Sequence, residues 1–323
     1  YRLFEERDLP GLLRLWEEAG WGTLTAEQWR GWFVETPNGQ ALVAVAVDEA
    51  GKVVAQEMFM PSRVWAAGRE VRALRFSAPI LNKELRGESL RRAGHPVVEL
   101  YKTAARAAAR AGFSVVYSLP EYAWLPVFRY AERFGLPRFA EASYPCVALP
   151  LGAAGDNGAG SNGEGFVARA VEEFGEEFDE LWHEARESFP VECGVVRDSA
   201  WLRFRNSGRI SVEVREASGN KLVGYTATKR QTGLLLDVLA RRPEELGAVI
   251  SASAGWLASE RGRLAPDGWT ELKAMRTPTL ARALDALGFA PSDYRFAFTC
   301  NTFDPSLALE QIAPERWYIM PGD

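Results

Sequence analysis

The hydrophobic residues of this chain follow two spacings, one typical of helices and one typical of strands. Apolar side chains recur at spacings of three and four in two long stretches: Val97, Leu100, Tyr101, Ala104 and Ala108, then Leu246, Val249, Ile250 and Leu257. Such spacing places them on one face of a helix. Short, mainly apolar runs at 41–47, 53–60, 71–81 and 210–214 predict strands instead.

The two halves of the chain repeat one pattern. Trp32 matches Trp201, Gly39 matches Gly208 and Lys52 matches Lys221, with the same separation each time and no gap between them. Each copy reads as a helix, a turn, a strand, a tight turn and a second strand. Glycine and asparagine tolerate positive φ, so residues 51–52 and 219–220 predict the two hairpin turns. We interpret the halves as a duplicated domain.

A segment of different composition separates the halves. Residues 152–165 read GAAGDNGAGSNGEG and cannot bury enough apolar surface to order themselves. We therefore expect an N-terminal domain at 1–150, a flexible linker at 151–165 and a C-terminal domain at 166–323. The alternative is a long loop inside one domain, but structureless loops of that length are uncommon in compact domains.

Each half has the same predicted order: strand, helix, antiparallel strands, helix, strand and helix. The last strand–helix pairs begin at residues 113–119 and 269–275, and the second closing helix ends at Gly288, a residue suited to a left-handed helix cap. This order predicts a mixed α/β (α+β) fold with a mainly antiparallel sheet flanked by helices.

Composition narrows the classes of function. The net charge of −5 gives no global positive field to attract nucleic acid or an anionic membrane, so we expect neither partner. Three scattered cysteines and two histidines favour neither disulfides nor a zinc site, and we expect no metal. The absence of a secretory pattern or an apolar run of membrane-spanning length leads us to expect a cytoplasmic protein. The oligomeric state stays open.

A basic, glycine-containing loop precedes the first long helix. Arg91, Arg92, Ala93, Gly94 and His95 follow the strand 71–81 and stand just before Val97. Unpaired amides at a helix start bind anions, and glycine lets backbone approach a phosphate closely. The alternative is a solvated basic loop that only caps the helix.

This loop, in this order of elements, resembles the GNAT family of acyl-CoA N-acyltransferases. In that family a loop with the pattern Gln/Arg-x-x-Gly-x-Gly/Ala holds the coenzyme A pyrophosphate; Arg91 and Gly94 fit it, whereas Pro96 replaces the final small residue. The Leu287-Gly288-Phe289 ending of the last predicted helix matches a second family motif. The resemblance implies two tandem GNAT-like domains.

The resemblance also implies roles for individual residues. The backbone near Ile80 and Leu81 would contact the thioester of acetyl-CoA, and Arg91 to His95 would hold its pyrophosphate. Glu57, a carboxylate in an apolar strand, is the candidate general base, unless strand alternation turns it to solvent. Tyr130 is the candidate acid, with a place in the core as the alternative.

In the second half, Pro243, Glu244 and Glu245 stand where the glycine loop would be, and these acids would repel a pyrophosphate. We therefore expect the C-terminal domain to have a degenerate coenzyme A site. The expected function is transfer of an acetyl group from acetyl-CoA to a primary amine of a small molecule, an amino sugar being one candidate. Two alternatives stay open: a non-catalytic GNAT-like scaffold with a decayed site, and aminoacyl transfer, which the acidic composition disfavours.

Overall fold

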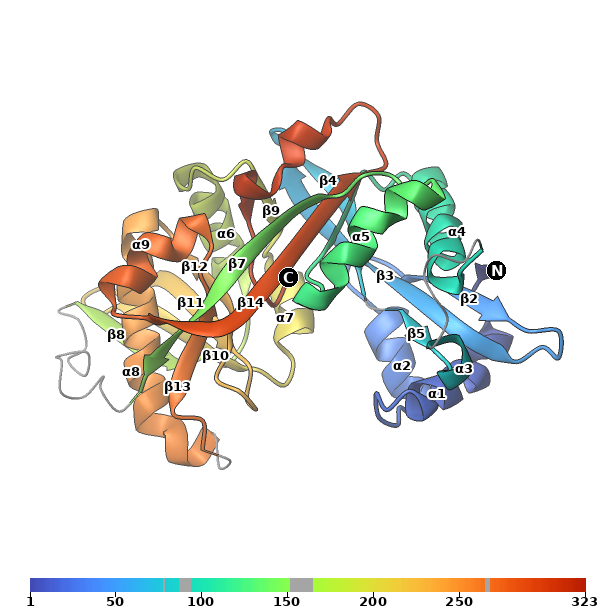
Figure 1. Ribbon diagram of the computed structural model, residues 1–323. Coiled ribbons are helices and arrows are strands. Elements are labelled where there is room, and N and C mark those ends of the chain that lie inside the picture. The colour runs from blue at the N-terminus through green and yellow to red at the C-terminus, as the bar shows by residue number, and fades with distance from the viewer. Residues whose placement is uncertain (78, 87–93, 152–164, 265–267) are drawn as a thin grey trace. The chain divides into compact units, whose positions relative to one another are not determined.

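The computed structural model describes residues 1–77, 79–86, 94–151, 165–264 and 268–323. These residues form two compact units (Figure 1). The first unit comprises Tyr1–Ala142 and Ala297–Arg316, and the second comprises Ser143–Phe296 and Trp317–Asp323. Most of the expected linker, at 152–164, lies outside the described residues.

A mixed sheet forms the centre of the first unit. Its strands, in spatial order, are β1 (Arg2–Leu3), β2 (Leu42–Val47), β3 (Val53–Ala66), β4 (Arg69–Phe76), β6 (Val115–Ser118) and the end of β14 (Ala290–Thr302). A short strand, β5 (Ile80–Leu81), also pairs with β3. All of these pairings are antiparallel except that of β4 with β6. The mixed, mainly antiparallel sheet is thus confirmed.

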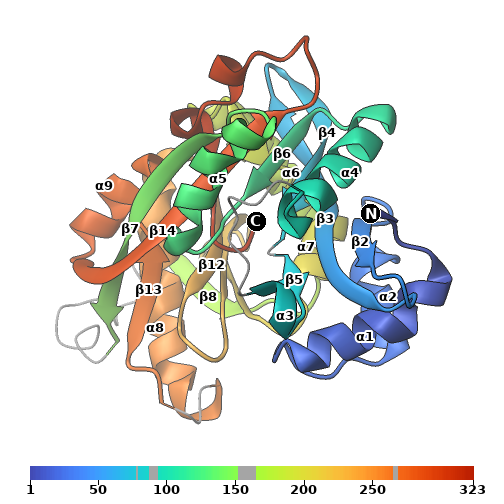
Figure 2. The ribbon, with the colours of Figure 1, turned by 45° about the vertical axis from the view of Figure 1, so that its right-hand side comes forward.

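Helices pack on the sheet of the first unit. They are α1 (Leu9–Glu18), α2 (Ala26–Phe33), α3 (Lys83–Arg86), α4 (Pro96–Arg110) and α5 (Leu125–Ala131), with 3-10 turns at Glu6–Asp8, Tyr122–Trp124, Glu132–Phe134, Leu309–Ile312 and Pro314–Arg316. Helix α4 packs on β2 and β3, while α1 contacts β3 and β5 (Figure 2). The strand expected at 71–81 is interrupted, because β4 ends at Phe76 and β5 begins at Ile80.

The first long helix forms where the apolar spacing predicts it. Pro96 occupies its first turn, where a missing N–H costs nothing, and His95 is its N-cap. Its apolar face, which includes Leu100 and Ala104, is fully buried in a core shared with Phe59 of β3. The buried face and the sheet thus enclose one continuous apolar core.

The predicted hairpin turns also form. Gly51 has a φ of +81° between β2 and β3, and Asn220 has a φ of +54° between the two equivalent strands of the second unit. Asp48 stabilises the first turn, since its carboxylate accepts hydrogen bonds from the backbone N–H groups of Ala50 and Lys52. The positive φ values explain why glycine and asparagine stand at these positions.

The second unit repeats the strand order of the first. Its strands are β8 (Phe166–Ala170), β10 (Ile210–Glu216), β11 (Leu222–Thr228), β12 (Leu235–Ala240), β13 (Glu271–Met275) and β7 (Ala140–Pro150, from residue 143 on). Leu234, the residue before β12, forms a single parallel β-bridge with Lys273 of β13, and this bridge places β13 next to β12. Strand β9 (Cys193–Val195) pairs in parallel with β15 (Trp317–Tyr318).

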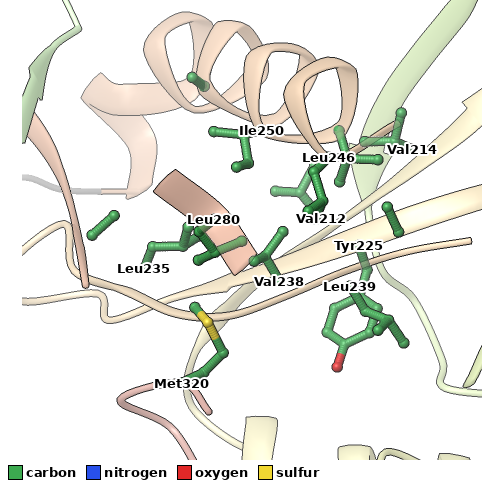
Figure 3. Close-up of a cluster of buried hydrophobic side chains, with 14 of the residues drawn as sticks. Val212, Val214, Tyr225, Leu235, Val238, Leu239, Leu246, Ile250, Leu280 and Met320 are labelled. Carbon is green, nitrogen blue, oxygen red and sulfur yellow. The ribbon is translucent and has the colours of Figure 1, made fainter. Parts of the chain in front are cut away.

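The helices of the second unit are α6 (Glu176–Ser188), α7 (Ser199–Asn206), α8 (Leu246–Leu264) and α9 (Pro278–Ala286), with a 3-10 turn at Pro243–Glu245. Figure 3 shows α8 lying over the sheet, with Leu246 and Ile250 directed toward Val212 of β10. Helix α9 adds Leu280, which is fully buried, to the same core. The second half of the sequence thus supplies most of this core, to which Val147 and Leu151 of the first half also belong.

The two units exchange their last strands. In the first unit the place beside β6 is taken by residues 299–302 of β14, which come from the second half of the sequence. In the second unit the place beside β13 is taken by residues 146–150 of β7, which come from the first half. The compact units therefore depart from the expected division at residues 150 and 166. A strand joins the sheet edge that it can pair with, whatever its position in the sequence.

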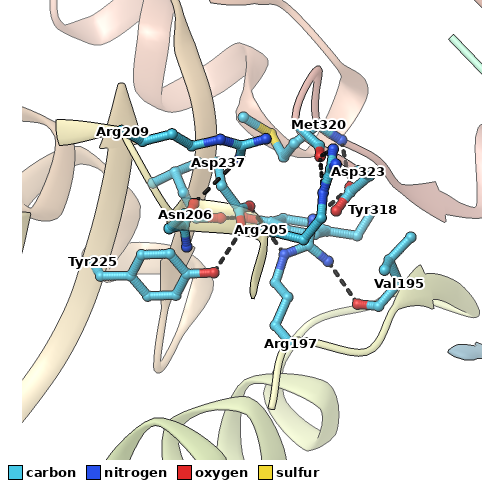
Figure 4. A network of polar contacts seen from close by, with 12 residues as sticks. Val195, Arg197, Arg205, Asn206, Arg209, Tyr225, Asp237, Tyr318, Met320 and Asp323 are labelled. Carbon is cyan, nitrogen blue, oxygen red and sulfur yellow. Dashed lines mark hydrogen bonds and ion pairs between the residues drawn. The ribbon is translucent and has the colours of Figure 1, made fainter. Parts of the chain in front are cut away.

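A buried charge network fixes residues 317–323 within the second unit (Figure 4). The guanidinium of Arg197 is fully buried; its Nε donates to Asp237 Oδ1 at 3.0 Å and one terminal nitrogen to Asp323 Oδ2 at 2.6 Å. The hydroxyl of Tyr225 donates to Asp237 Oδ2 at 2.6 Å. Asp237, a polar outlier in an apolar run, is thus a structural partner of Arg197.

Candidate functional site

The β4–β5 segment changes register opposite Glu57. Phe59 faces Phe76 and Gln56 faces Ile80, so three steps along β3 correspond to four steps along the facing segment. A one-residue excess of this kind bends a strand and interrupts its pairing. The excess residue falls at residues 77–79, of which Ala78 lies outside the described residues. Such shifts are frequent beside active sites, where they redirect backbone groups.

Glu57 is buried at this shift. Its side chain is completely excluded from solvent, and within the described part of the chain neither carboxylate oxygen has a hydrogen-bond partner. Strand alternation puts it on the same face as Ala55 and Phe59, in the apolar core beneath α4. Burial raises the pKa of the carboxyl well above its ordinary value, because the charged form loses its hydration. The solvent-facing alternative is therefore wrong.

Tyr101 of α4 is the second buried polar group of this core. Its ring packs against Phe59 and Phe76, with ring centroids 5.5 Å and 5.8 Å away. Its hydroxyl finds no hydrogen-bond partner among the residues that the structure describes. Burial, and secondarily the charge of Glu57, raise its pKa well above the ordinary value. Unpaired buried polar groups are costly, so this pair of groups beneath α4 makes the region a candidate site.

The backbone of β5 offers an open edge. Ile80 pairs with Gln56, and the N–H of Asn82 donates to the carbonyl of Val54 at 2.9 Å. Backbone groups alternate in direction along a strand, so the N–H and C=O of Leu81 point away from β3. The carbonyl of Leu81 accepts a hydrogen bond from Arg86 Nε at 2.9 Å. Strand β4, which precedes β5 in the chain, pairs with β3 on one side and with β6 on the other. The Leu81 N–H points to the side of β5 that corresponds to the β6 side of β4.

A pocket of about 320 Å³ lies along this edge. We call it the β5 pocket; it is lined by Ala19, Trp21, Pro79, Ile80, Leu81, Leu85, Arg86, His95, Val97 and Trp124. Most of these side chains are apolar, and Arg86 and His95 supply the charged or polar groups. An apolar pocket with a few polar groups is the usual form of a small-molecule site. Ile80, Leu81 and His95, selected from the sequence, therefore share one cavity.

The first amides of α4 are bonded to the residue that caps the helix. The ring of His95 is buried, and its Nδ1 accepts a hydrogen bond from the N–H of Val97 at 3.3 Å. The next two N–H groups, of Val98 and Glu99, donate to the carbonyl of His95 at 3.0 Å and 3.2 Å. Pro96 has no N–H. The first amides of the helix are thus occupied by the cap rather than directed at a ligand.

The other loop and acid candidates are only partly visible. Arg91, Arg92 and Ala93 lie outside the described residues. Gly94 has a φ of +77°, a backbone conformation that favours glycine. Tyr130 belongs to α5, but the position of its side chain also lies outside the description.

The equivalent place in the second unit carries acids, as the sequence shows. The turn Pro243–Glu245 precedes α8, and the carboxylate of Glu245 accepts a hydrogen bond from the N–H of Arg242 at 3.0 Å. Burial raises the pKa of Glu245. A pocket of about 360 Å³ beside this turn is lined partly by Glu244 and by Arg282 of α9.

Neither a protein-family model nor a curated protein matches the sequence. Solved structures do match. A GCN5-related N-acetyltransferase from Anabaena variabilis superposes with a TM-score of 0.63 at 14% identity, over 95% of this chain and 73% of that chain. A tandem GNAT protein from the clavulanic acid biosynthesis pathway superposes with a TM-score of 0.54 at 15% identity, over 94% and 98% of the two chains. The chain has a tandem GNAT fold.

A further solved structure extends the comparison. The N-myristoyltransferase of Saccharomyces cerevisiae, solved with bound myristoyl-CoA and inhibitors, superposes with a TM-score of 0.58 at 14% identity, over 92% of this chain and 77% of that chain. At this identity the likeness shows the GNAT fold, and the chemistry has to be argued from the site itself. In the described ranges no cluster of three or more His, Cys, Asp or Glu could hold a metal ion. No helix there is long and apolar enough to cross a membrane.

Three features of the candidate site were not predicted from the sequence. The register shift at 77–79 carries one readable signal, Pro79 in the middle of a strand pattern, since proline cannot donate to a sheet ladder. Helix α3 follows Asn82, whose Oδ1 caps it by accepting from the N–H of Leu85 at 3.0 Å; asparagine before a helix is a start signal. The capping role of His95 has no comparable signal, because histidine is not a favoured cap.

Proposed function

We propose that this protein transfers an acyl group from an acyl-CoA to an amine, with the donor held in the β5 pocket of the first unit. The observation that carries the proposal is the open edge of β5, with the Leu81 N–H directed away from β3, next to the register shift opposite Glu57. An extended amide-containing donor can pair with such an edge as an added strand. The apolar lining suits its uncharged part.

Glu57 is the proposed general base. An amine attacks the thioester carbonyl, the carbon–sulfur bond breaks, and the amine proton passes to the Glu57 carboxylate directly or through a water molecule. Burial raises the pKa of Glu57, and a carboxylate with a raised pKa is a stronger base. In the β5 backbone at Ile80 and Leu81, the N–H of Leu81, which points away from β3, is the proposed donor to the carbonyl oxygen. Tyr130 remains the proposed acid for the leaving thiolate.

More specifically, we propose that the acyl group is acetyl and that the acceptor is a primary amine of a small molecule. The likeness to N-myristoyltransferase makes a longer acyl chain the alternative donor. We propose that the second unit does not bind coenzyme A, because Glu244 and Glu245 place negative charge where a pyrophosphate would lie. A site that has lost catalysis is the competing proposal, and the occupied amides at the start of α4 favour it.

The test combines binding and turnover. Acetyl-CoA should raise the melting temperature of the wild type with a dependence of RT ln(1 + [L]/Kd). Release of free coenzyme A thiol is then measured with a panel of primary amines for the wild type and Glu57→Gln. We expect Glu57→Gln to bind acetyl-CoA normally and to lose roughly 10²- to 10⁴-fold in kcat.

The pH profile identifies the base. kcat/KM of the wild type should rise with pH as Glu57 loses its proton, and the rising limb should be absent in Glu57→Gln. Binding of acetyl-CoA without turnover of any amine would favour the non-catalytic protein. No binding at millimolar concentration would rule out the acyltransferase.

A further inference from the structure

Tyr101 is a buried tyrosine that the proposed reaction does not use. It lies on the face of α4 that packs on the sheet, and only 3% of its surface is exposed. Its ring is held by Phe59, Phe76 and Phe139, with ring centroids 5.5 Å, 5.8 Å and 5.7 Å away. The hydroxyl therefore has a defined position, although no residue that the structure describes forms a hydrogen bond with it.

Glu57 faces the same core from the sheet. It stands two residues before Phe59 on β3, so both side chains point toward α4. The two polar groups are within electrostatic reach of each other, because the charge of Glu57 contributes to the raised pKa of Tyr101. A buried carboxyl and a buried hydroxyl, each without a hydrogen-bond partner in the described part of the chain, thus share one apolar core.

The surroundings of Glu57 offer little other charge. Its direct neighbour in the sheet is Ala44 of β2, and burial by itself accounts for the raised pKa of its carboxyl. The hydrophobic core beneath α4, as far as the structure describes it, contains no titratable side chain besides Tyr101. Glu99 and Lys102, the charged residues beside Tyr101 on α4, pair with each other at 3.0 Å and are partly exposed.

An ionised carboxylate in such a core needs a donor. A base has to be ionised before it can accept a proton from the amine, and a buried charge without a hydrogen bond is strongly disfavoured. A tyrosine hydroxyl can donate to a carboxylate, and a buried water molecule commonly bridges two polar groups that do not touch. In the described core, Tyr101 is the side chain that can supply this donor to Glu57.

We propose that Tyr101 is the positioning residue of Glu57, and that its hydroxyl donates a hydrogen bond to the ionised carboxylate, directly or through one water molecule. The inference rests on the proposed function and deepens it, because it names the group that allows Glu57 to act as a base. Tyr101 keeps its own proton throughout. The proton of the amine passes to Glu57, and the hydrogen bond from Tyr101 stabilises the carboxylate before that transfer.

The experiment follows the titration of the Glu57 carboxyl by NMR, with glutamate labelled at the carboxyl carbon and the signal identified by its loss in Glu57→Gln. Tyr101→Phe keeps the ring and removes only the hydroxyl. Because the ionised form then loses its donor, the midpoint of the Glu57 titration should rise by about one pH unit, which makes Glu57 a tenfold weaker acid. This measurement requires no substrate and does not depend on catalysis.

The chain offers a matched control in Tyr117 of β6. Tyr117 is also fully buried, but its neighbour Val116 belongs to the core beneath α4, so strand alternation turns Tyr117 to the other face of the sheet. Tyr117→Phe removes the same hydroxyl from the same type of side chain. It should leave the midpoint of the Glu57 titration unchanged.

Stability gives a second measurement on the same variants. The folded pKa of Glu57 is raised, so the stability associated with its neutral form is present below the unfolded pKa and is lost as pH rises through the folded pKa. Tyr101→Phe raises that folded pKa further, so its melting temperature should fall relative to the wild type as pH rises. In a Glu57→Gln background, the same substitution should change the melting temperature equally at every pH.

Three results overturn the inference. They are a Glu57 titration that Tyr101→Phe leaves in place or moves downward, an equal movement in Tyr117→Phe, and a change in melting temperature that is the same at every pH in both backgrounds, which would show a packing role. The pH profile of kcat/KM separates this inference from the proposed function. If Tyr101→Phe moves the titration and the rising limb together, both are supported; if it moves only the titration, Tyr101 positions Glu57 but Glu57 is not the base.

Discussion

Glu57 shows how the environment of one residue changes its chemistry. The carboxyl lies between Ala55 and Phe59 on a strand whose inner face is apolar, and within the described part of the chain it has no hydrogen-bond partner. The folded protein therefore favours its neutral form, and the unfolded chain does not. The polar group was recognisable in the sequence as an exception in an apolar run. The direction of the Glu57 side chain could not be predicted, because the alternation of residues along a strand does not show which face of the sheet is covered by a helix.

A first prediction concerns stability and pH. The folded pKa of Glu57 is raised above its unfolded value, so the stability associated with the neutral carboxyl is fully present below the unfolded pKa and is lost as pH rises through the folded pKa. Glu57→Gln stays neutral at every pH. The melting temperature of the wild type should therefore fall relative to Glu57→Gln as pH rises from about 4.5 upward. A constant difference between the two across pH 4 to 9 would contradict the raised pKa.

A second prediction uses two glycines of the second unit. A Cβ on Gly224 of β11 would lie 2.4 Å from the Leu239 carbonyl oxygen and 2.7 Å from Val249 of α8. Gly224→Ala should therefore cost at least about 1–3 kcal/mol by overpacking. Gly247 of α8 meets nothing within 4 Å, so Gly247→Ala should stabilise by roughly 0.5–1 kcal/mol through helix propensity. Urea unfolding measures both, and equal effects would be inconsistent with the close approach of α8 to β11.

At the scale of elements, the local signals were sufficient for α4 and for the β2–β3 hairpin. Proline in the first turn, apolar residues at helical spacing and Gly51 in the turn all specify short-range conformation. The strand expected at 71–81 was less well predicted, since it forms two strands with a register shift between them. Register depends on the partner strand β3, which the pattern of one strand does not contain.

The capping of α4 gives a third prediction. His95→Ala removes the acceptor for the Val97 N–H and should cost about 0.5–2 kcal/mol of unfolding free energy, whereas His95→Asn keeps a capping acceptor and should cost less. Chemical denaturation measures the unfolding free energy of the three proteins, which should decrease from the wild type to His95→Asn and then to His95→Ala. Equal stability of the Ala and Asn variants would show that the ring contributes by packing and not by its hydrogen bond.

At the scale of the whole molecule, each unit is completed by a strand from the other half of the sequence. β6 is paired by residues 299–302 in the first unit, and β13 by residues 146–150 in the second. Residues 317–323 return to the second unit, where Asp323 binds the buried Arg197. The repeat in the sequence predicts two similar units, but it does not predict which copy of the last strand joins which sheet.

The exchange leads to a fourth prediction. A protease site placed in the Gly-rich segment 152–164 should, after cleavage, leave two fragments that stay together on gel filtration and melt as the intact chain does. The same fragments produced separately should be unstable, because each sheet lacks its last strand and exposes an open edge. Mixing the two should restore the fold. Fragments that separate and keep their melting temperatures would contradict the exchange.

By itself the sequence determined local features of this protein: the long helices α4 and α8, the β2–β3 hairpin, the positive-φ turns and the doubled order of elements. These features depend on residues that are close together in the sequence, within about one or two helical turns of each other. The tertiary structure alone decided the burial of Glu57, the register shift opposite it and the exchange of β7 and β14. Each of these depends on contacts between segments far apart in the chain, and several partners fit the same local pattern until packing selects one.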